Sequence, residues 1–352
     1  MYNVKFDDFF RISFSIASIY RRSNFFRKEQ LLKSTDEYFN GWFKEENIDI
    51  VLSHLSTNVD DFKEKQNKSF TDDIYSYLYQ FNILREKPII DINGKLRCPI
   101  PIIIADRLST GVYFDLANYY SQTLKNRSDF TTNYGVLFED YVGYMLSEFY
   151  QVNIELYAAN EYYNQHIGGK RNIPSLCDWI IIENDTVILI ECKSGKLPLN
   201  IASTGNLEDL KSFLIDHYLN KGKLQFDFLY NHFTEKGKKV FSIIIYNDYI
   251  NIYNKYDRIF EDVIDIVYNI NKYSTQFMSV YDFESILPQL HDSKFQDILI
   301  DKLKIENKDK SFDDLIKKTN GFNKLRQLKT INSAWKNITG VSPKNATRSR
   351  DQ

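Results

Sequence analysis

The chain has 352 residues, of which 43% are hydrophobic and 26% are charged, a balance typical of a globular protein with one large or two ordinary domains. Its formal net charge of −2 excludes a protein whose whole surface is basic, so any contact with nucleic acid must be made by a local basic region. No apolar run approaches a membrane span, no signal peptide is recognisable, and the three widely spaced cysteines predict a cytoplasmic protein with reduced thiols and no zinc cluster.

Residues 1–130 are expected to form a mostly helical N-terminal lobe. The stretches that begin at Phe6 and at Phe70 carry apolar residues at helical spacing. Between Lys87 and Ala105 the pattern changes, and Asn93-Gly94 predicts a hairpin near residues 88–104. The lobe holds no catalytic motif and is interpreted as a support or recognition lobe. Three isolated basic residues of the lobe could contact phosphate or could simply be solvated surface residues. They are Arg97, Arg107 and Lys125.

A long amphipathic helix is predicted over Asn133–Tyr150, followed by a short strand over Val152–Ala158. Gly135 would allow the helix to approach a sheet closely. The loop over Glu161–Asn172 carries Lys170 and Arg171 and could approach a phosphate backbone or simply connect two elements. The residues expected to form the buried stripe of the helix are Val136, Tyr141, Tyr144 and Met145.

Two apolar strands, Ser175–Glu183 and Thr186–Lys193, are predicted on either side of an Asn184-Asp185 turn. Both lack a polar face, so the hairpin is expected to lie at the centre of a core. Three ionisable residues nevertheless interrupt it, and buried charge is costly unless it is paired or bound to metal. These residues are Asp178, Glu191 and Lys193.

The spacing of these three residues predicts a cation site. Glu191 and Lys193 are two apart and share a face of their strand, and Asp178 on the antiparallel partner can lie beside them. Mg²⁺ takes one or two carboxylates plus water and phosphate oxygens, and a neighbouring lysine can orient a metal-bound water. The alternative is an ordinary Glu191–Lys193 ion pair at a strand end, with Asp178 as an exposed edge charge.

After the hairpin, a helix start is predicted at Ser203–Asn206 and a buried strand over Lys239–Asn247. A further strand over Tyr249–Asn254 and a covering helix over Arg258–Lys272 are expected to follow. From Phe277 onward the chain is expected to be helical. Residues 302–350 hold 13 Lys or Arg against 4 Asp or Glu, which predicts a local backbone-binding stripe or a solvated helix face.

Asp178 followed by Glu191-Cys192-Lys193 on two adjacent apolar strands resembles the motif of the PD-(D/E)xK nuclease superfamily, although Cys177 replaces the usual preceding proline. The resemblance covers roughly Asn133 to Asp248. It implies an α/β restriction-endonuclease-like fold, whose αβββαβ core on a mixed central sheet agrees with the predicted order of elements. The expected domains are a helical lobe over 1–130, a nuclease core over 131–273 and a basic helical extension over 274–352.

The resemblance also implies roles for individual residues. Asp178 and Glu191 would hold Mg²⁺, with Mn²⁺ as an alternative, and the backbone carbonyl of Cys192 is a further candidate ligand. Glu139 would bind the metal directly or through water, with Asp140 and Glu148 as competing acids on the same helix.

Lys193 would align the attacking water. By a partial match to RecB-type relatives, Gln225 would contact the scissile phosphate or position Lys193. The lysines expected to contact the DNA backbone are Lys196, Lys221 and Lys223.

The function expected from these observations is metal-dependent endonucleolytic hydrolysis of DNA, in bacterial defence or on a mobile element. An RNA-directed nuclease and a catalytically silent nucleic-acid-binding scaffold are the alternatives. The expected partners are nucleic acid, an ATPase or another component of a defence system, and a second copy of the chain. No contact with a membrane is expected.

Overall fold

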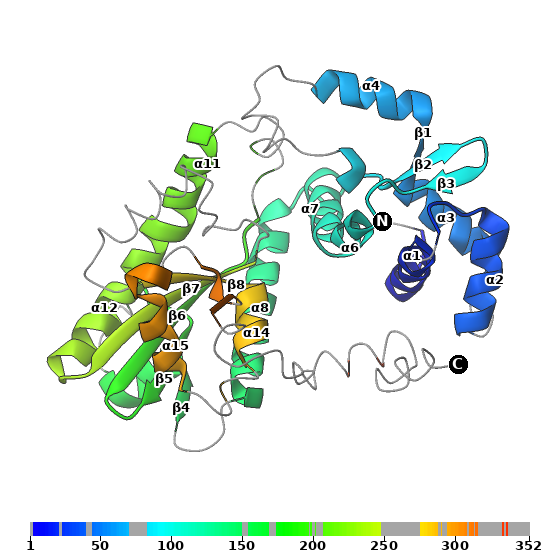
Figure 1. Ribbon diagram of the computed structural model, residues 1–352. Coiled ribbons are helices and arrows are strands. Elements are labelled where there is room, and N and C mark those ends of the chain that lie inside the picture. The colour runs from blue at the N-terminus through cyan, green and yellow to red at the C-terminus, as the bar shows by residue number, and fades with distance from the viewer. Residues whose placement is uncertain are drawn as a thin grey trace. The chain divides into compact units, whose positions relative to one another are not determined.

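The computed structural model describes residues 3–20, 23–39, 44–69, 83–149, 154–168, 174–196, 207–247, 275–287 and 294–307, together with a few short stretches and single positions. The chain divides into two compact units (Figure 1). Unit 1 consists mainly of Met1–Phe130, and unit 2 of Thr131–Ile201 and Asn206–Arg326. No helix in the described part of the chain is long and apolar enough to cross a membrane.

Unit 1 combines helices with a three-stranded sheet. The apolar residues of its first helix recur every three or four positions, so Phe9, Ile12 and Ile16 are fully buried on one face. The elements of unit 1 are α1 (Phe6–Tyr20), α2 (Lys28–Phe39), α3 (Glu45–Leu55), β1 (Ser56–Asn58), α4 (Val59–Ser69), η1 (Ile83–Arg85), β2 (Ile89–Ile92), β3 (Lys95–Arg97), α6 (Ile102–Asp106), η2 (Arg107–Gly111) and α7 (Val112–Gln122).

The predicted hairpin near residues 88–104 is confirmed as β2 and β3. Asn93 and Gly94 both have positive φ angles, 53° and 75°, which is the backbone that a tight hairpin turn requires. β2 pairs antiparallel with β3 and parallel with β1. On its other side, β3 meets the chain at Phe26, whose backbone exchanges hydrogen bonds with Leu96.

Unit 2 is built on a mixed five-stranded sheet in the order β4-β5-β6-β7-β8. The pairs β4/β5 and β5/β6 are antiparallel, and β6/β7 and β7/β8 are parallel. The elements of unit 2 are α8 (Arg127–Phe149, which begins in unit 1), β4 (Glu155–Ala158), α9 (Ala159–Tyr162), η3 (Tyr163–Ile167), β5 (Trp179–Glu183), β6 (Thr186–Lys193), α11 (Leu207–Leu214), η4 (Ile215–Asn220), α12 (Lys221–Glu235), β7 (Lys239–Tyr246), β8 (Thr275–Ser279), α14 (Val280–Ile286), α15 (Phe295–Lys302) and η6 (Ile305–Asn307).

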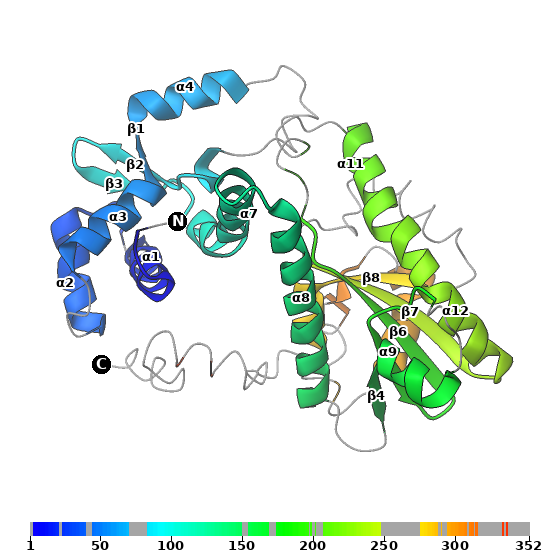
Figure 2. The same cartoon turned by 180° about the vertical axis from the view of Figure 1, so that it is seen from behind.

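Helices cover the sheet of unit 2 on both sides. α12 packs against β6 and β7, and α8 lies on the opposite side of the strands (Figure 2). From α8 to β7 the strands β4, β5, β6 and β7 follow one another as predicted, but the order of elements differs in detail. The helical turns α9 and η3 lie between β4 and β5, where a loop over Glu161–Asn172 was expected, and α11 and η4 precede α12. Unit 2 is therefore an α/β layer structure in which the central strands β6 and β7 are buried along almost their whole length.

Two expectations about unit 2 were wrong in detail. The chain was expected to be helical from Phe277, but Thr275–Ser279 forms β8, because the buried residues Gln276, Phe277 and Met278 extend the parallel edge of the sheet. The expected buried stripe of α8 was right for Met145, which is fully buried, and Tyr141 is half-buried, but it was wrong for the other two residues. Val136 and Tyr144 are 48% and 56% exposed. The apolar residues that α8 buries are Phe130, Phe138, Val142, Met145 and Leu146.

The close approach of α8 to the sheet occurs at Gly143 and not at Gly135. A Cβ atom at Gly143 would lie 1.9 Å from Cζ2 of Trp179, whereas one at Gly135 would meet only Ser194 Oγ at 3.6 Å. Several predictions fall outside the described residues: the helix from Phe70, the cations Lys170 and Arg171, the elements expected over 249–272 and most of the basic segment over 302–350.

Candidate active site

The β5–β6 hairpin positions the predicted site residues at one end of the sheet of unit 2. Asn184 has a φ angle of 53°, as expected for the predicted turn, and Trp179 pairs with Ile190. Asp178 immediately precedes β5 and continues its ladder, because its N–H donates to the Ile190 carbonyl at 2.9 Å. The sheet thus holds the backbone at Asp178 in place, independently of the contacts of the Asp178 side chain.

The structure brings Asp178, Glu191 and Lys193 together. Asp178 Oδ2 accepts a 2.6 Å hydrogen bond from the backbone N–H of Cys192, between the other two residues. Lys193 Nζ lies 2.5 Å from Glu191 Oε1, and the side chain of Glu191 is only 2% exposed. The arrangement follows from strand geometry, since residues two apart in β6 share a face.

Gln225, on α12, completes the surroundings of Lys193. Its Oε1 accepts a 2.8 Å hydrogen bond from Lys193 Nζ, so the ammonium is held between Gln225 and Glu191. This hydrogen bond is the contact expected if Gln225 positions Lys193, and a contact with the scissile phosphate stays a prediction.

Glu139 reaches the site from α8. Its backbone carbonyl accepts a 3.1 Å hydrogen bond from Trp179 Nε1, which ties α8 to the residue that follows Asp178. Burial raises the pKa of the Glu139 carboxyl, and the charge of Asp140 raises it further, while Lys193 opposes the shift. Asp140 itself is exposed to solvent, and Glu148 lies more than two helical turns along α8.

Carboxyl groups gather at this end of the sheet, and their surroundings oppose their ionisation. Burial, reinforced by the charge of Glu139, raises the pKa of Asp178 to about 7. Burial, reinforced by the charge of Asp178, raises the pKa of Glu191 to about 8, even though Lys193 opposes the shift. The carboxyl groups of Glu139, Asp178 and Glu191 therefore share the ammonium group of Lys193, which opposes the rise in pKa of each of them.

The surroundings of Glu191 test whether a cation fits. Its Oε2 atom is buried and has no hydrogen-bond partner among the described residues, which is uncommon for a buried carboxylate oxygen. Within the described part of the chain, no three His, Cys, Asp or Glu side chains are grouped as a metal-binding set. The two carboxylates and the unpartnered oxygen of Glu191 fit an ion that takes one or two carboxylates and completes its coordination with water and phosphate oxygens, as Mg²⁺ does.

Cys192 contacts the site through its backbone N–H, whereas its backbone carbonyl was the expected metal ligand. Its backbone N–H holds Asp178, and its side chain is buried. All three cysteines of the chain are buried, and none forms a disulfide in this structure.

Lys196 was expected to contact a DNA backbone, and that expectation was wrong. The residue is 9% exposed, and its Nζ donates to the backbone carbonyl of Asn247 at 3.0 Å. Asn247 is in turn tied to β6, because its N–H donates to the Lys193 carbonyl. Lys196 thus stabilises the chain next to the site. The side chains of Lys221 and Lys223 lie outside the described residues.

Sequence reasoning missed His217, which is on η4. A Cβ atom added at Gly195, two residues beyond Lys193, would come within 3.4 Å of Nε2 of His217, so the imidazole lies beside this segment. The ring also stacks on Phe213 at 4.7 Å. No local signal indicates this placement, because η4 is a π-helical turn that changes the register between His217 and Gln225.

No protein-family model matches this sequence, and the search of the curated proteins found no match. Among solved structures, the small subunit of the heterodimeric restriction endonuclease R.BspD6I aligns with 55% of this chain and 90% of its own chain. The sequence identity is 17% and the TM-score is 0.29. A likeness this weak carries no weight for function, which has to be inferred from the residues of the site.

Proposed function

We propose that this protein is a metal-dependent endonuclease of the PD-(D/E)xK type that hydrolyses phosphodiester bonds in DNA, with unit 2 as its restriction-endonuclease-like core. The observation that carries the proposal is the convergence of Asp178, Glu191 and Lys193 at the end of a buried hairpin. Burial of two carboxylates against a single lysine is unfavourable in a purely structural role. A divalent cation would offset the excess charge and engage the unpartnered oxygen of Glu191.

Each residue of the site has a defined task in this proposal. Asp178 and Glu191 hold Mg²⁺ or Mn²⁺, and the Cys192 N–H keeps the Asp178 carboxylate in place. A bound divalent ion lowers the pKa of a coordinated water and polarises the phosphate. Lys193, oriented by Gln225 and Glu191, aligns the water and stabilises negative charge that develops on the phosphate oxygens.

Two further candidates belong to the same site. Glu139 adds a third carboxylate from α8, and the backbone carbonyl of Cys192 is an additional candidate ligand. Glu139 would bind the ion directly or through a coordinated water. Assembly with an ATPase, with another defence component or with a second copy of the chain stays a prediction.

The proposal is tested by incubating the purified protein with linear, covalently closed circular and single-stranded DNA, and with RNA, in Mg²⁺, Mn²⁺ or EDTA. Cleavage of circular DNA in either metal, and none in EDTA, is the expected result. Preferential loss of RNA would favour an RNA-directed nuclease. Binding of nucleic acid with no metal-dependent cleavage of any substrate would favour a catalytically silent scaffold and overturn the proposal.

The raised carboxyl pKa values predict how metal-free protein responds to pH. The folded-state values of about 7 for Asp178 and about 8 for Glu191 lie above the ordinary values near 4 of the unfolded chain. The unfolded chain therefore releases these protons first. Stability from the protonated pair is fully present below about pH 4 and is lost as the pH rises to about 8.

The corresponding measurement is thermal unfolding in EDTA and in Mg²⁺ across this pH range, without nucleic acid. The contribution of the site to the unfolding temperature in EDTA is expected to fall with rising pH. Stabilisation by Mg²⁺ is expected to grow over the same interval, because the metal binds the ionised carboxylates. A double variant, Asp178→Asn with Glu191→Gln, serves as the control and should lose both effects. Equal Mg²⁺ stabilisation of the double variant would contradict a metal site at these residues.

A further inference from the structure

A group of cationic side chains around an exposed aromatic ring lies on unit 1, at the contact between Phe26 and β3. Phe26 and Leu96 are buried and exchange two backbone hydrogen bonds, 3.0 and 2.9 Å long, as an antiparallel pair. In such a pair, the residues that flank the two partners point to the opposite face. The four flanking residues, here called the Phe25 patch, are Phe25, Arg27, Lys95 and Arg97.

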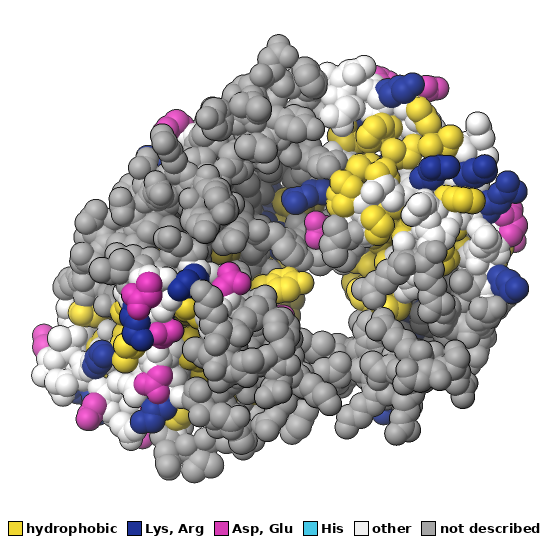
Figure 3. All heavy atoms as spheres, in the orientation of Figure 1, with side chains coloured by type: hydrophobic (Ala, Val, Ile, Leu, Met, Phe, Trp, Pro, Cys, Tyr) yellow, Lys and Arg dark blue, Asp and Glu magenta, His cyan; other side chains and the backbone are white. Residues whose placement is uncertain are grey.

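All four side chains of the Phe25 patch are exposed. Lys95 Nζ lies 5.6 Å and Arg97 Cζ lies 5.7 Å from the centre of the Phe25 ring, within the range of a cation–π contact. Figure 3 shows Lys and Arg side chains gathered beside hydrophobic ones over the β2–β3 region of unit 1. The ring thus holds two cations near each other, although like charges on one small face repel.

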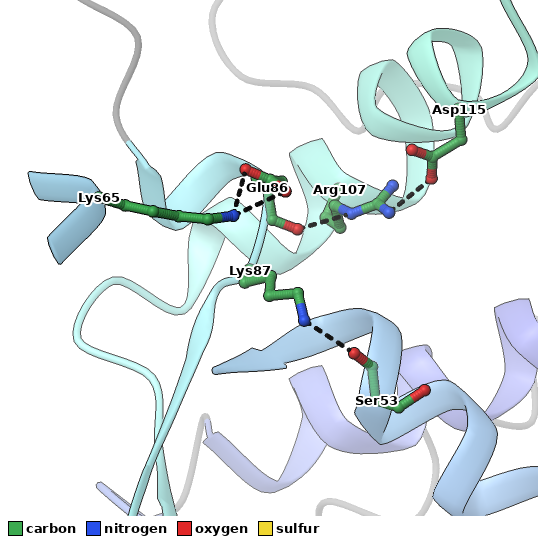
Figure 4. Close-up of polar contacts among 6 residues, drawn as sticks. All are labelled: Ser53, Lys65, Glu86, Lys87, Arg107 and Asp115. Atoms are coloured by element: carbon green, nitrogen blue, oxygen red, sulfur yellow. Dashed lines mark hydrogen bonds and ion pairs between the residues drawn. The ribbon is translucent and has the colours of Figure 1, made fainter. Parts of the chain in front are cut away.

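Several other cations of unit 1 are held by oxygen partners, unlike those of the patch. Lys65 lies 3.1 Å from a carboxylate oxygen of Glu86, and Arg107 pairs with Asp115 at 2.5 Å, while Lys87 donates to the Ser53 carbonyl (Figure 4). Arg107, which had been a candidate for phosphate contact, is therefore a buried structural residue. Lys28 likewise pairs with two carboxylates.

By contrast, none of the carboxylates in the described part of the chain lies within ion-pair distance of the three cations of the patch. The whole chain carries a net charge of −2, so three clustered positive charges are a local departure from its average. An exposed aromatic ring among cations suits a nucleic-acid strand, whose phosphates pair with the cations and whose unpaired bases stack on aromatic rings.

We propose that the Phe25 patch is a nucleic-acid-binding surface, in which Arg27, Lys95 and Arg97 contact backbone phosphates and Phe25 stacks on an unpaired base. The inference deepens the proposed function, on which it rests for the choice of DNA. Binding at the patch does not require cleavage, so the two proposals can fail separately.

The test uses the full-length protein in EDTA, so that no cleavage can occur. Binding of fluorescently labelled single-stranded and duplex oligonucleotides is followed by anisotropy over a series of salt concentrations. Each variant Arg27→Gln, Lys95→Gln or Arg97→Gln is expected to weaken binding. Each is also expected to reduce the slope of log K against log salt by about 0.7 for single strands or about 0.9 for duplex.

Lys65→Gln is the matched control, since it removes the same charge from the same unit at a residue already paired with Glu86. The proposal expects the control to keep the wild-type slope. Equal slopes for the control and the three patch variants would overturn it. Phe25→Leu tests stacking and is expected to weaken single-strand binding by about 5-fold or more, with little effect on duplex. Unchanged single-strand affinity in Phe25→Leu would overturn the assignment of the ring.

Cleavage of the same oligonucleotides in Mg²⁺ separates the two proposals. Reduced salt slopes in a protein that never cleaves would support the patch and reject the nuclease. Cleavage in Mg²⁺, combined with unaltered salt slopes of binding in all patch variants, would reject the binding surface but not the proposed nuclease activity. Far-ultraviolet circular dichroism of each variant shows that the exposed substitutions leave the fold intact.

Discussion

Asp178→Asn and Glu191→Gln are each expected to lower metal-dependent cleavage by at least about 100-fold, the scale on which a single preorganised electrostatic group acts. Each change keeps the shape of the side chain and removes the negative charge that would bind the cation. In the Asp178→Asn variant, the amide oxygen of the new side chain can still accept the Cys192 N–H, so the local backbone should be preserved. Initial rates of nicking of circular DNA at saturating Mg²⁺ give the measurement.

These two variants also separate catalysis from folding. Burial raises the pKa of both carboxyl groups, which means that ionising them opposes folding at neutral pH. Asp178→Asn, which breaks no ion pair among the described residues, is therefore expected to leave the metal-free unfolding temperature unchanged or raised while activity is lost. Glu191→Gln gives up the ion pair with Lys193 as well, so its unfolding temperature is the less direct readout. Lys193→Ala is also expected to lose cleavage, but it removes the ion pair of Glu191 and is less clean as a test.

Asp185→Asn is the matched control for the carboxylate variants. Asp185 lies in the turn at the other end of the same hairpin, and its side chain is fully exposed. The chemical change is the same, but cleavage should stay at the wild-type rate. Wild-type cleavage by Asp178→Asn, Glu191→Gln and Lys193→Ala alike would rule out the hydrolytic site.

Gly143→Ala is expected to destabilise unit 2 by about 1–3 kcal/mol, the usual range for inserting a methyl group into a packed interior. The added Cβ would lie 1.9, 2.3 and 2.5 Å from three atoms of the Trp179 ring, so the helix or the indole must move. Either movement disturbs the hydrogen bond from Trp179 Nε1 to the Glu139 carbonyl. The urea concentration at the unfolding midpoint is the measurement.

Gly135→Ala, in the same helix, is the control for this prediction. A Cβ atom at Gly135 would meet Ser194 Oγ at 3.6 Å, which is ordinary van der Waals contact. Because alanine is the better helix former, the control should be neutral or stabilised by up to about 1 kcal/mol. If Gly143→Ala were as stable as Gly135→Ala, the close packing of α8 on Trp179 would be wrong.

Elements whose signals are local could be predicted from the amino-acid sequence without further information. Apolar runs on either side of Asn184-Asp185 and of Asn93-Gly94 specify two hairpins, because the turn residues and the strand residues are neighbours in the chain. The placement of Glu191 and Lys193 on one face follows from the period of a strand. The contact of Lys193 with Gln225 was among the alternatives, although sequence could not choose it over a phosphate contact.

Which side chains from distant segments meet became clear only from the folded chain. α8 has apolar residues around much of its circumference, so its buried face depends on the sheet against which it packs, and Gly143 has its role only because Trp179 lies opposite. Lys196 is likewise indistinguishable from a surface lysine until Asn247 is placed beside it. The Phe25 patch needs Phe26 to pair with Leu96, a contact between residues 70 positions apart. Local patterns encode period and turn geometry, whereas such pairings depend on the packing of the complete chain.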